Sequence, residues 1–367
     1  MKRKLLSLLL LLALLIPFTG CDALLSGLTD GGADLAVPAD GKTLTVSFLD
    51  VGQGDSILIE LPDGNTMLID ASEADQAEGI IDYIEDRGHD TLDYVVATHP
   101  HADHIGGMAE VLEAFDVGEI WMPDADSDTQ TYENLLETVE KKEIPLHVAA
   151  AGKTILATES LSIEVIAPCS DEYDDLNDYS AVISLTYGKT RFIFTGDAEA
   201  LSEAEILKSG VSLSADVLKL GHHGSSTSSS EAFVKAVDPR WGIISCGEGN
   251  SYGHPHKETL DLAEQLGIEL LRTDLIGTIV MTSDGQTVKY GDSESGGNAD
   301  ADDENQAAPA PGTGYHWVLN TSSKKIHRED CKYAESISED NRGESNKSVS
   351  ELEAEGYTPC GTCKPKD

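Results

Sequence analysis

The sequence has few basic residues. Its 25 Lys and Arg stand against 66 Asp and Glu, which gives a net charge of −41 over 367 residues. Proteins that bind nucleic acid through charge alone usually present a basic surface. This composition argues against such a surface and fits a well-solvated protein outside the cytoplasm.

Long apolar runs are also scarce. The N-terminal run from Leu5 to Ile16 is shorter than the roughly 20 residues that cross a membrane. It follows the basic start MKRK and leads to FTGC, which ends at Cys21, a pattern typical of a secretory signal with a lipobox. We therefore expect a signal peptide over 1–20, a lipidated Cys21 and a polar tether over 21–42. The alternative is an uncleaved N-terminal anchor, and in either case the rest of the protein would lie on the extracellular face of the cell membrane.

Cysteine is the third scarce residue, with six in the chain. Cys21 is assigned to lipid, and three more cysteines cluster near the C-terminus. Cys169 and Cys246 end apolar, strand-like runs. We expect these two to be buried free thiols rather than a disulfide.

The organisation of the chain indicates an α/β protein. Aromatic residues make up 5%, but 40% of residues are hydrophobic, and 34 glycines indicate many turns. Strand-like runs lie at 43–51, 56–61, 66–70, 92–98, 117–123, 145–150, 161–168, 181–187, 190–197, 216–223, 241–246, 268–273 and 277–283. Helical periodicity lies at 76–88, 104–115, 131–143, 203–210, 230–238 and 257–267. Short strands mixed with helices predict a layered α/β domain over 43–291.

Two further segments follow this domain. Residues 292–313 are acidic residues, Gly, Ala and Pro without apolar periodicity, which predicts a disordered linker. A small second module is expected over 314–367.

The stretch THPHADHIGG (98–107) concentrates metal-ligand residue types: it holds His99, His101, Asp103 and His104 directly after an apolar strand. Histidines at i and i+2 can bind one cation at a strand end, and Asp103 and His104, at the turn that follows, can reach a second. Neutral imidazole and carboxylate suit zinc, manganese or iron. We therefore predict a metal site here.

The HxHxDH pattern resembles the signature of the metallo-β-lactamase superfamily. The likeness continues in order through LDVGQGDS (49–56), LIDAS (68–72), FTGD (194–197), VLKLGHHGSS (217–226) and YGHPH (252–256). Together these motifs resemble the metallo-β-lactamase domain of ComEC-type competence proteins over about residues 43–290, without the membrane channel part of those proteins. The resemblance implies a four-layer αββα sandwich and a metal-dependent hydrolase.

The resemblance also implies a ligand set. His99 and His101 would hold a first metal, Asp103 and His104 a second, and Asp197 would bridge both. His222 would complete the second site. Two divalent metals, Zn or Mn, about 3.5–4 Å apart would share an activated hydroxide and clamp a phosphoryl or acyl oxygen.

The chain departs from the superfamily pattern at one ligand. Most members supply another histidine before the bridging aspartate, but only His147 lies in that interval, too early and in a probable strand. Asn177 or Asp178 lies nearer the expected place. The first site then binds weakly or prefers manganese, or the enzyme uses a single metal.

Further polar residues surround these motifs. His223 and His254 are expected to act on the substrate. Together with Asp103 they form the predicted catalytic group. Ser225 and Ser226 could donate hydrogen bonds to the same anion, whereas His256 is interpreted as a helix N-terminal residue. Asp50, Asp55 and Asp70 either orient ligand histidines or satisfy turn backbone.

The C-terminal module contains HREDC (327–331) and PCGTC (359–363). His327, Cys331, Cys360 and Cys363 form a Cys3His set, which predicts one structural zinc with no open position. The module resembles small Ada-like metal-binding modules, and a fragment of this size needs such a staple. With 8 Lys and Arg against 10 Asp and Glu, its net charge is −2, so it is the part best suited to approach a polyanion.

Three functions remain open. The first is an extracellular, lipid-anchored phosphodiesterase or nuclease acting on DNA, a substrate suggested by the family resemblance and not by the charge. The second is a metallohydrolase of a cell-envelope phosphodiester or of a lactone or lactam. The third is a non-catalytic lipoprotein that binds DNA or a wall polymer. No protein partner is evident.

Overall fold

The computed structural model describes residues 41–291 and, in the C-terminal module, residues 317–321, 324–328, 334, 342–345, 347, 349, 352, 357–360 and 365. The predicted signal peptide, the linker and, apart from its last two residues, the tether lie outside the described residues, as do Cys21, Cys331 and Cys363. No helix within the described ranges is long and apolar enough to cross a membrane.

Two mixed sheets form the hydrolase domain. The first has the order β15 (Val288–Tyr290), β14 (Ile279–Ser283), β1 (Leu44–Phe48), β2 (Ile57–Glu60), β3 (Thr66–Ile69), β4 (Thr91–Val96), β5 (Asp116–Met122) and β6 (Leu146–Val148). The second has the order β13 (Glu269–Arg272), β12 (Trp241–Ile244), β11 (Val217–Lys219), β10 (Thr190–Phe194), β9 (Val182–Tyr187), β8 (Leu161–Ala167) and β7 (Lys153–Ala157). Strands β3 to β6 run parallel to one another, and so do β10 to β13.

The central strands are buried on both faces, and β2 shows how. Ile57 and Ile59 pack in the core between the two sheets, where Phe48 of β1 meets Phe194 of β10. Leu58 points the other way and packs with helix residues. Alternate side chains of a strand face opposite sides, so a strand covered on both faces has a continuous apolar run.

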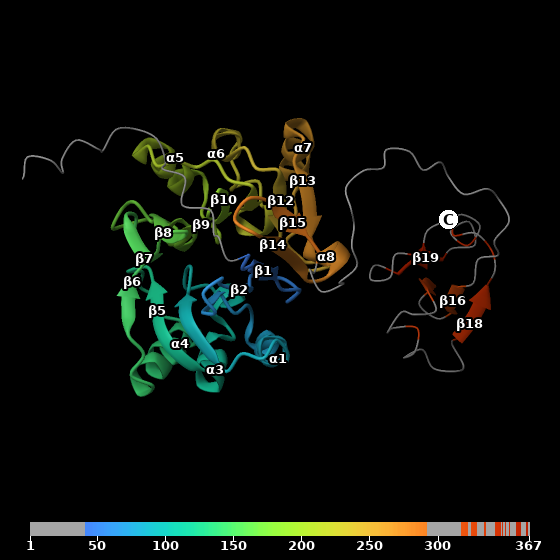
Figure 1. Ribbon diagram of the computed structural model, residues 1–367, viewed down its shortest axis with the longest axis horizontal. Helices are drawn as coiled ribbons and strands as arrows, with labels where there is room; N and C mark the ends of the chain where they lie inside the picture. The colour runs from blue at the N-terminus through green and yellow to red at the C-terminus, as the bar shows by residue number, and fades with distance from the viewer. Residues whose placement is uncertain are drawn as a thin grey trace, which may run out of the picture. The chain divides into compact units, whose positions relative to one another are not determined.

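Helices cover the outer face of each sheet. The first sheet packs against α1 (Ala77–Asp86), α3 (Met108–Ala114) and α4 (Gln130–Lys141). The second packs against α5 (Ala200–Ser209), α6 (Glu231–Val237) and α7 (Lys257–Leu266). The two groups of helices lie on opposite sides of the sandwich (Figure 1). This confirms the expected four-layer αββα arrangement.

The structure differs from the sequence-based elements in a few places. The helix expected over 104–115 divides into α2 (Ala102–Ile105) and α3. Gly106 and Gly107 lie between them, and a Cβ atom at either would approach backbone of the segment after β3 to 2.6 Å. Edge strands β7 and β15 were not predicted, because each is short and partly exposed. The short α8 (Thr273–Ile276) was not predicted either.

The two cysteines of this domain have different environments. Both are free thiols, as expected, and Cys246 is buried. Cys169 is exposed, so its predicted burial was wrong. It follows the end of β8, in a loop outside the sheet.

The C-terminal module has its own sheet. Its order is β18 (Arg342–Ser345), β16 (Trp317–Asn320), β17 (Lys325–Arg328) and β19 (Thr358–Pro359). Its buried side chains include Trp317, Leu319, Ile326, Val349 and Leu352.

Candidate metal centre

The candidate site lies where several strands end. Asp70 follows β3, His99 follows β4, Asp197 follows β10, and His222 and His223 follow β11. In each sheet these strands run parallel. Parallel strands bring their carboxyl ends to one edge, which is where α/β folds build binding sites.

The HxHxDH stretch forms one wall of the site. His99 is buried, and its Nε2 lies 3.0 Å from Nδ1 of His101. His101 is the N-terminal cap residue of α2, and the single turn of that helix carries Asp103 and His104. The sharp turn into α2 therefore gathers all four side chains that the sequence singled out.

Asp197 lies at the centre of the histidines. Its Oδ1 is 3.2 Å from His104 Nε2. Its Oδ2 is 4.0 Å from Nε2 of His99, 3.7 Å from that of His222 and 3.5 Å from that of His223. The predicted bridging residue thus faces two groups of donors with its two oxygens.

A second set of side chains holds the ligands from behind. Asp70 accepts hydrogen bonds from Thr98 and lies 2.7 Å from His104 Nδ1. Thr98 Oγ1 and Ser180 Oγ lie 3.1 and 3.3 Å from His99 Nδ1. Such outer partners fix the ring orientation of metal-binding histidines.

The HHG segment is held in a similar way. Asp55 Oδ1 lies 3.4 Å from His223 Nδ1, and the Ser245 carbonyl oxygen lies 3.0 Å from the same nitrogen. The buried ammonium of Lys219 is 2.9 Å from Asp55 Oδ2. Of the three aspartates considered above, Asp55 and Asp70 orient histidines. Asp50 instead accepts from the turn amide of Gly52.

Burial and close charges govern the titration of the site. Burial, with help from His104, holds the pKa of His99 well below its usual value. Burial also opposes the charged forms of His104 and Asp197, but their mutual attraction prevails, raising the pKa of His104 and lowering that of Asp197. The pKa of His223 is raised against burial by Asp197 and Asp103. Without a metal, protonated histidines therefore hold this cluster together. A metal ion that binds here would displace those protons.

The residues fit a metal. His104 Nε2 and Asp197 Oδ1 face each other but have no hydrogen-bond partner among the described residues. A buried polar atom without a partner costs about 1–3 kcal/mol. Single ligand atoms of Asp55, His104, Asp197 and His223 all lie within 4.8 Å of one another. Since Asp55 is already paired with Lys219, the remaining nitrogen and oxygen donors are those that suit a divalent metal.

The two histidines of the HHG segment occupy different places. His222 was expected to complete the second site, but His223 lies closer to it, with Nε2 3.2 Å from Asp103 Oδ2. His223 was expected to act on substrate, yet its side chain is buried. The geometry therefore favours His223 as the partner of Asp103 and His104.

Asn177 and Asp178, the suggested first-site substitutes, point elsewhere. The Asn177 amide donates to Glu199, and Asp178 accepts from the backbone N–H of Ser202 at the start of α5. Ser180, in the same segment, contacts His99 instead. His147 lies on edge strand β6, stacked on Trp121 with ring centroids 4.8 Å apart, in agreement with its structural interpretation.

Two further histidines, His254 and His256, lie near the HHG segment. The His254 ring lies 5.4 Å from that of His222 and 6.2 Å from that of His223. Burial and the neighbouring His223 and His222 lower the pKa of His254 to about 4. His256 precedes α7 as its cap residue, as expected, and its Nδ1 accepts the Ser226 N–H.

Sequence reasoning missed four supporting residues: Thr98, Ser180, Glu199 and Lys219. A charged residue inside the apolar strand run VLKL was a usable signal for Lys219, since a fully buried lysine needs a partner. The other three had no signal of their own, since they are ordinary polar residues beside motif positions.

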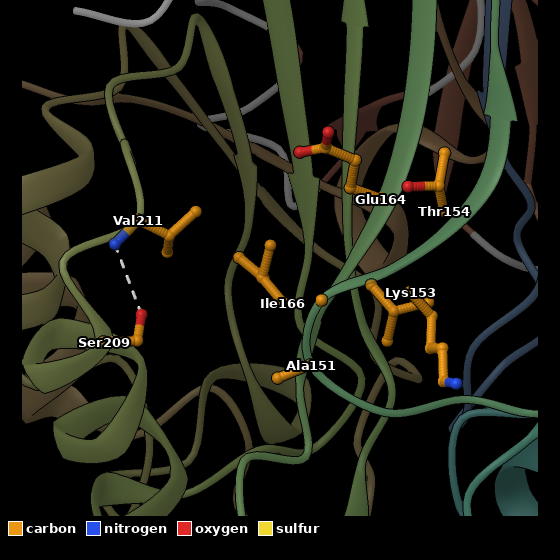
Figure 2. Close-up of a pocket in the computed structure, with 9 residues that line it drawn as sticks. Ala151, Lys153, Thr154, Glu164, Ile166, Ser209 and Val211 are labelled. Carbon is orange, nitrogen blue, oxygen red and sulfur yellow. Dashed lines mark hydrogen bonds between the residues drawn. The ribbon is translucent and has the colours of Figure 1, made fainter. Parts of the chain in front are cut away.

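An acidic pocket lies on segments that lead into the site. It is lined by Asp124, Asp126, Asp171, Glu172, Tyr173, Asp174, Leu176, Tyr179 and Leu201. Its segments continue into the site: Tyr179 precedes Ser180, and Leu201 follows Glu199 by two residues. A different pocket lies between β7, β8 and the end of α5, and no histidine lines it. Figure 2 shows Ser209 and Val211 at its border.

Half of the predicted zinc set of the C-terminal module is described. His327 and Cys360 are both buried. Ile326 pairs with Pro359 in parallel strands, and the Cys360 N–H donates to the Ile326 carbonyl at 2.8 Å. This register places the residues that follow the pair, His327 and Cys360, next to each other along the two backbones.

Comparison with known proteins agrees with this site. The family model described as "Metallo-beta-lactamase superfamily" matches residues 49–248. ComE operon protein 3 of Bacillus subtilis is 30% identical over 251 residues, 64% of this chain and 32% of that protein. Competence protein ComA of Neisseria gonorrhoeae is 30% identical over 245 residues, 66% of this chain and 33% of that protein.

The chain thus spans about a third of the length of these curated relatives. Among solved structures, the metallo-beta-lactamase fold protein YhfI from Bacillus subtilis aligns with a TM-score of 0.46 and 14% identity, covering 66% of this chain and all of that one. The family match covers more than half of the 367 residues and all of the HxHxDH, TGD and HHG motifs. The chain belongs to the metallo-β-lactamase superfamily, as a metal-dependent hydrolase.

Proposed function

We propose that this protein is a phosphodiesterase that uses two divalent metals, zinc or manganese, and that DNA is its substrate. The observation that carries the proposal is Asp197, whose Oδ1 faces His104 and whose Oδ2 faces His99, His222 and His223. A carboxylate shared in this way suits two ions. The names of two relatives, a ComE operon protein and a competence protein, favour DNA among phosphodiesters.

Two bound divalent ions would supply an acidified water and a clamp on a phosphoryl oxygen. The protein residues position these groups. Asp70, Asp55 and Glu199 fix the rings of His104, His223 and His222 through their Nδ1 atoms. His254 is neutral at pH 7 because its pKa is lowered to about 4, so we assign it a hydrogen bond to a phosphoryl oxygen rather than protonation of a leaving group.

A second substrate class is favoured by the acidic pocket. Five carboxylates line it, those of Asp124, Asp126, Asp171, Glu172 and Asp174, and they would repel a polyanion at close range. A cell-envelope phosphodiester polymer that carries ammonium groups would place its phosphate at the histidines and its cations in this pocket. DNA would need to approach from another side.

The test is a substrate panel with the full chain. Single-stranded DNA, duplex DNA, an amine-bearing phosphodiester polymer and a lactone are incubated with added Mn²⁺, added Zn²⁺ or EDTA, beside an Asp197→Asn variant. Metal-dependent DNA cleavage that is lost in the variant supports the nuclease assignment. Cleavage of the amine-bearing polymer or lactone alone would move the assignment to that class, and DNA binding without any hydrolysis would make the protein a binding lipoprotein.

We also propose the structural zinc of the C-terminal module, held by His327, Cys331, Cys360 and Cys363. Its support is the neighbouring, buried pair His327 and Cys360. A zinc content that is lower by one ion per chain in Cys360→Ala than in wild type after the same dialysis supports this site, and an equal zinc content in the two proteins would contradict it.

Finally, we propose that the protein is anchored to the extracellular face of the membrane through Cys21, on the basis of its N-terminal sequence. Mass spectrometry of protein purified from membranes tests this, with an acyl mass on Cys21 as the expected result. An intact N-terminus with unmodified Cys21 would exclude the lipid anchor.

A further inference from the structure

We propose that the adjacent residues His222 and His223 divide between the two metals. His223 completes the site of Asp103 and His104, and His222 supplies the third imidazole of the site of His99 and His101. This inference rests on the proposed two-metal site, but not on the identity of the substrate.

Both rings approach the bridging carboxylate at the spacing of ligands. Asp197 Oδ2 lies 3.7 Å from His222 Nε2 and 3.5 Å from His223 Nε2. Two ligand atoms that are each about 2.1 Å from one tetrahedral ion are about 3.4 Å apart. Each histidine therefore stands where it could share an ion with Asp197.

The two rings then diverge. Their planes are 72° apart and their centroids are 6.1 Å apart. His223 Nε2 turns toward Asp103, at 3.2 Å, on the side of the second site. His222 and His223 both approach Oδ2 of Asp197, the oxygen that also faces His99 Nε2 at 4.0 Å, but His223 turns away toward Asp103. His222 is therefore left on the side of His99, whose Nε2 lies 3.0 Å from His101 Nδ1.

His222 is also supported as a ligand would be. Its Nδ1 lies 3.1 Å from Glu199 Oε1 and 3.3 Å from Thr227 Oγ1. Thr227 donates to the same carboxylate oxygen at 2.8 Å. A carboxylate on one ring nitrogen fixes the tautomer that leaves the other nitrogen available to a metal.

The backbone is strained to present both rings. His222 and His223 have φ values of 50° and 54°, in the left-handed region that residues with side chains seldom adopt. Two such residues in succession are unfavourable and persist only where the surrounding structure holds them in place. The double strain is consistent with two ligands in consecutive positions.

This assignment accounts for the ligand missing from the chain. Asn177 and Asp178 are occupied with Glu199 and α5, and Ser180 orients His99 from the side of Nδ1. The third nitrogen of the first site would then come from the loop after β11 rather than from the segment between α2 and Asp197.

Mn²⁺ binding to the full chain tests the assignment by equilibrium dialysis. Manganese is used because the thiolates of the C-terminal module do not suit it. Wild type is expected to bind two ions. His222→Ala, and the more conservative His222→Gln, should weaken the binding of one Mn²⁺ ion by about tenfold or more. Asp103→Asn should weaken the binding of the other ion. His147→Ala, on edge strand β6, is the matched control and should bind as wild type.

The double variants decide which site each histidine serves. His222→Ala with Asp103→Asn should lose both ions, whereas His222→Ala with His101→Ala should lose only one. Unchanged binding of two ions by both His222 variants, or one ion retained by His222→Ala with Asp103→Asn, would overturn the assignment. A wild type that binds fewer than two ions would instead refute the two-metal site itself. The circular dichroism of each variant in EDTA shows whether it has folded.

Discussion

At the scale of single residues, the site depends on buried charges that compensate one another. Burial disfavours the ionised form of Asp55, but Lys219 and His223 outweigh it and lower its pKa to about 2. Lys219 is fully buried and also donates to the Leu220 carbonyl. The ion pair thus lies behind His223 and fixes a residue that orients a ligand.

Replacing Lys219 by Met should destabilise the protein by about 3–5 kcal/mol, because it leaves the Asp55 carboxylate buried without its cation. Adding Asp55→Asn should recover part of this loss, since the unpaired charge is then removed. Urea unfolding in EDTA measures both effects. Lys235→Met, which breaks the exposed pair with Glu231, is the control and should change stability little. Equal stability of Lys219→Met and wild type would refute the compensation.

At the scale of elements, turns rather than strands set the geometry of the site. Strands β1 and β2 are joined by the GQGD turn, in which the Asp55 N–H donates to the Asp103 carbonyl at 3.1 Å. Gly54 has φ +145°, and a Cβ atom there would lie 2.5 Å from the Asp103 carbonyl oxygen and 2.4 Å from Ser72 Oγ. The turn therefore packs directly on α2.

Gly54→Ala should cost about 2–4 kcal/mol, because it combines a strained backbone with a clash against backbone. It should also weaken Mn²⁺ binding, since Asp103 must move. Gly52→Ala is the matched control: Gly52 has φ +69° but open space around it, so a cost of about 1–2 kcal/mol and unchanged metal binding are expected. Both are read from urea unfolding and equilibrium dialysis. Equal metal affinity in the two variants would contradict the proposed contact.

The same turns mark the limit of prediction from sequence. Buried strands and amphipathic helices carry their periodicity in the chain, so β1 to β6, β8 to β14 and all the longer helices could be placed. Ligand residues within a motif could be named too, such as His99, His104 and Asp197. Which of His222 and His223 faces Asp103 depends on two left-handed residues, and side-chain periodicity does not encode such a turn.

At the scale of the whole molecule, the negative charge of the chain opposes the approach of an anionic substrate, whereas the metal centre favours it. The chain carries −41, and five carboxylates line the acidic pocket. The metal centre is the positive element that would draw a phosphate inward. On this account, substrate affinity depends on the bound ions rather than on a basic surface.

The central claim is that Asp197 joins two metals in one centre. Its most direct test is the manganese content of full-chain wild type and Asp197→Asn after the same dialysis, measured by inductively coupled plasma mass spectrometry. We expect two ions per chain in wild type and loss of both in the variant, because each site shares that carboxylate. Two ions retained by Asp197→Asn, or no metal in folded wild type, would contradict the account.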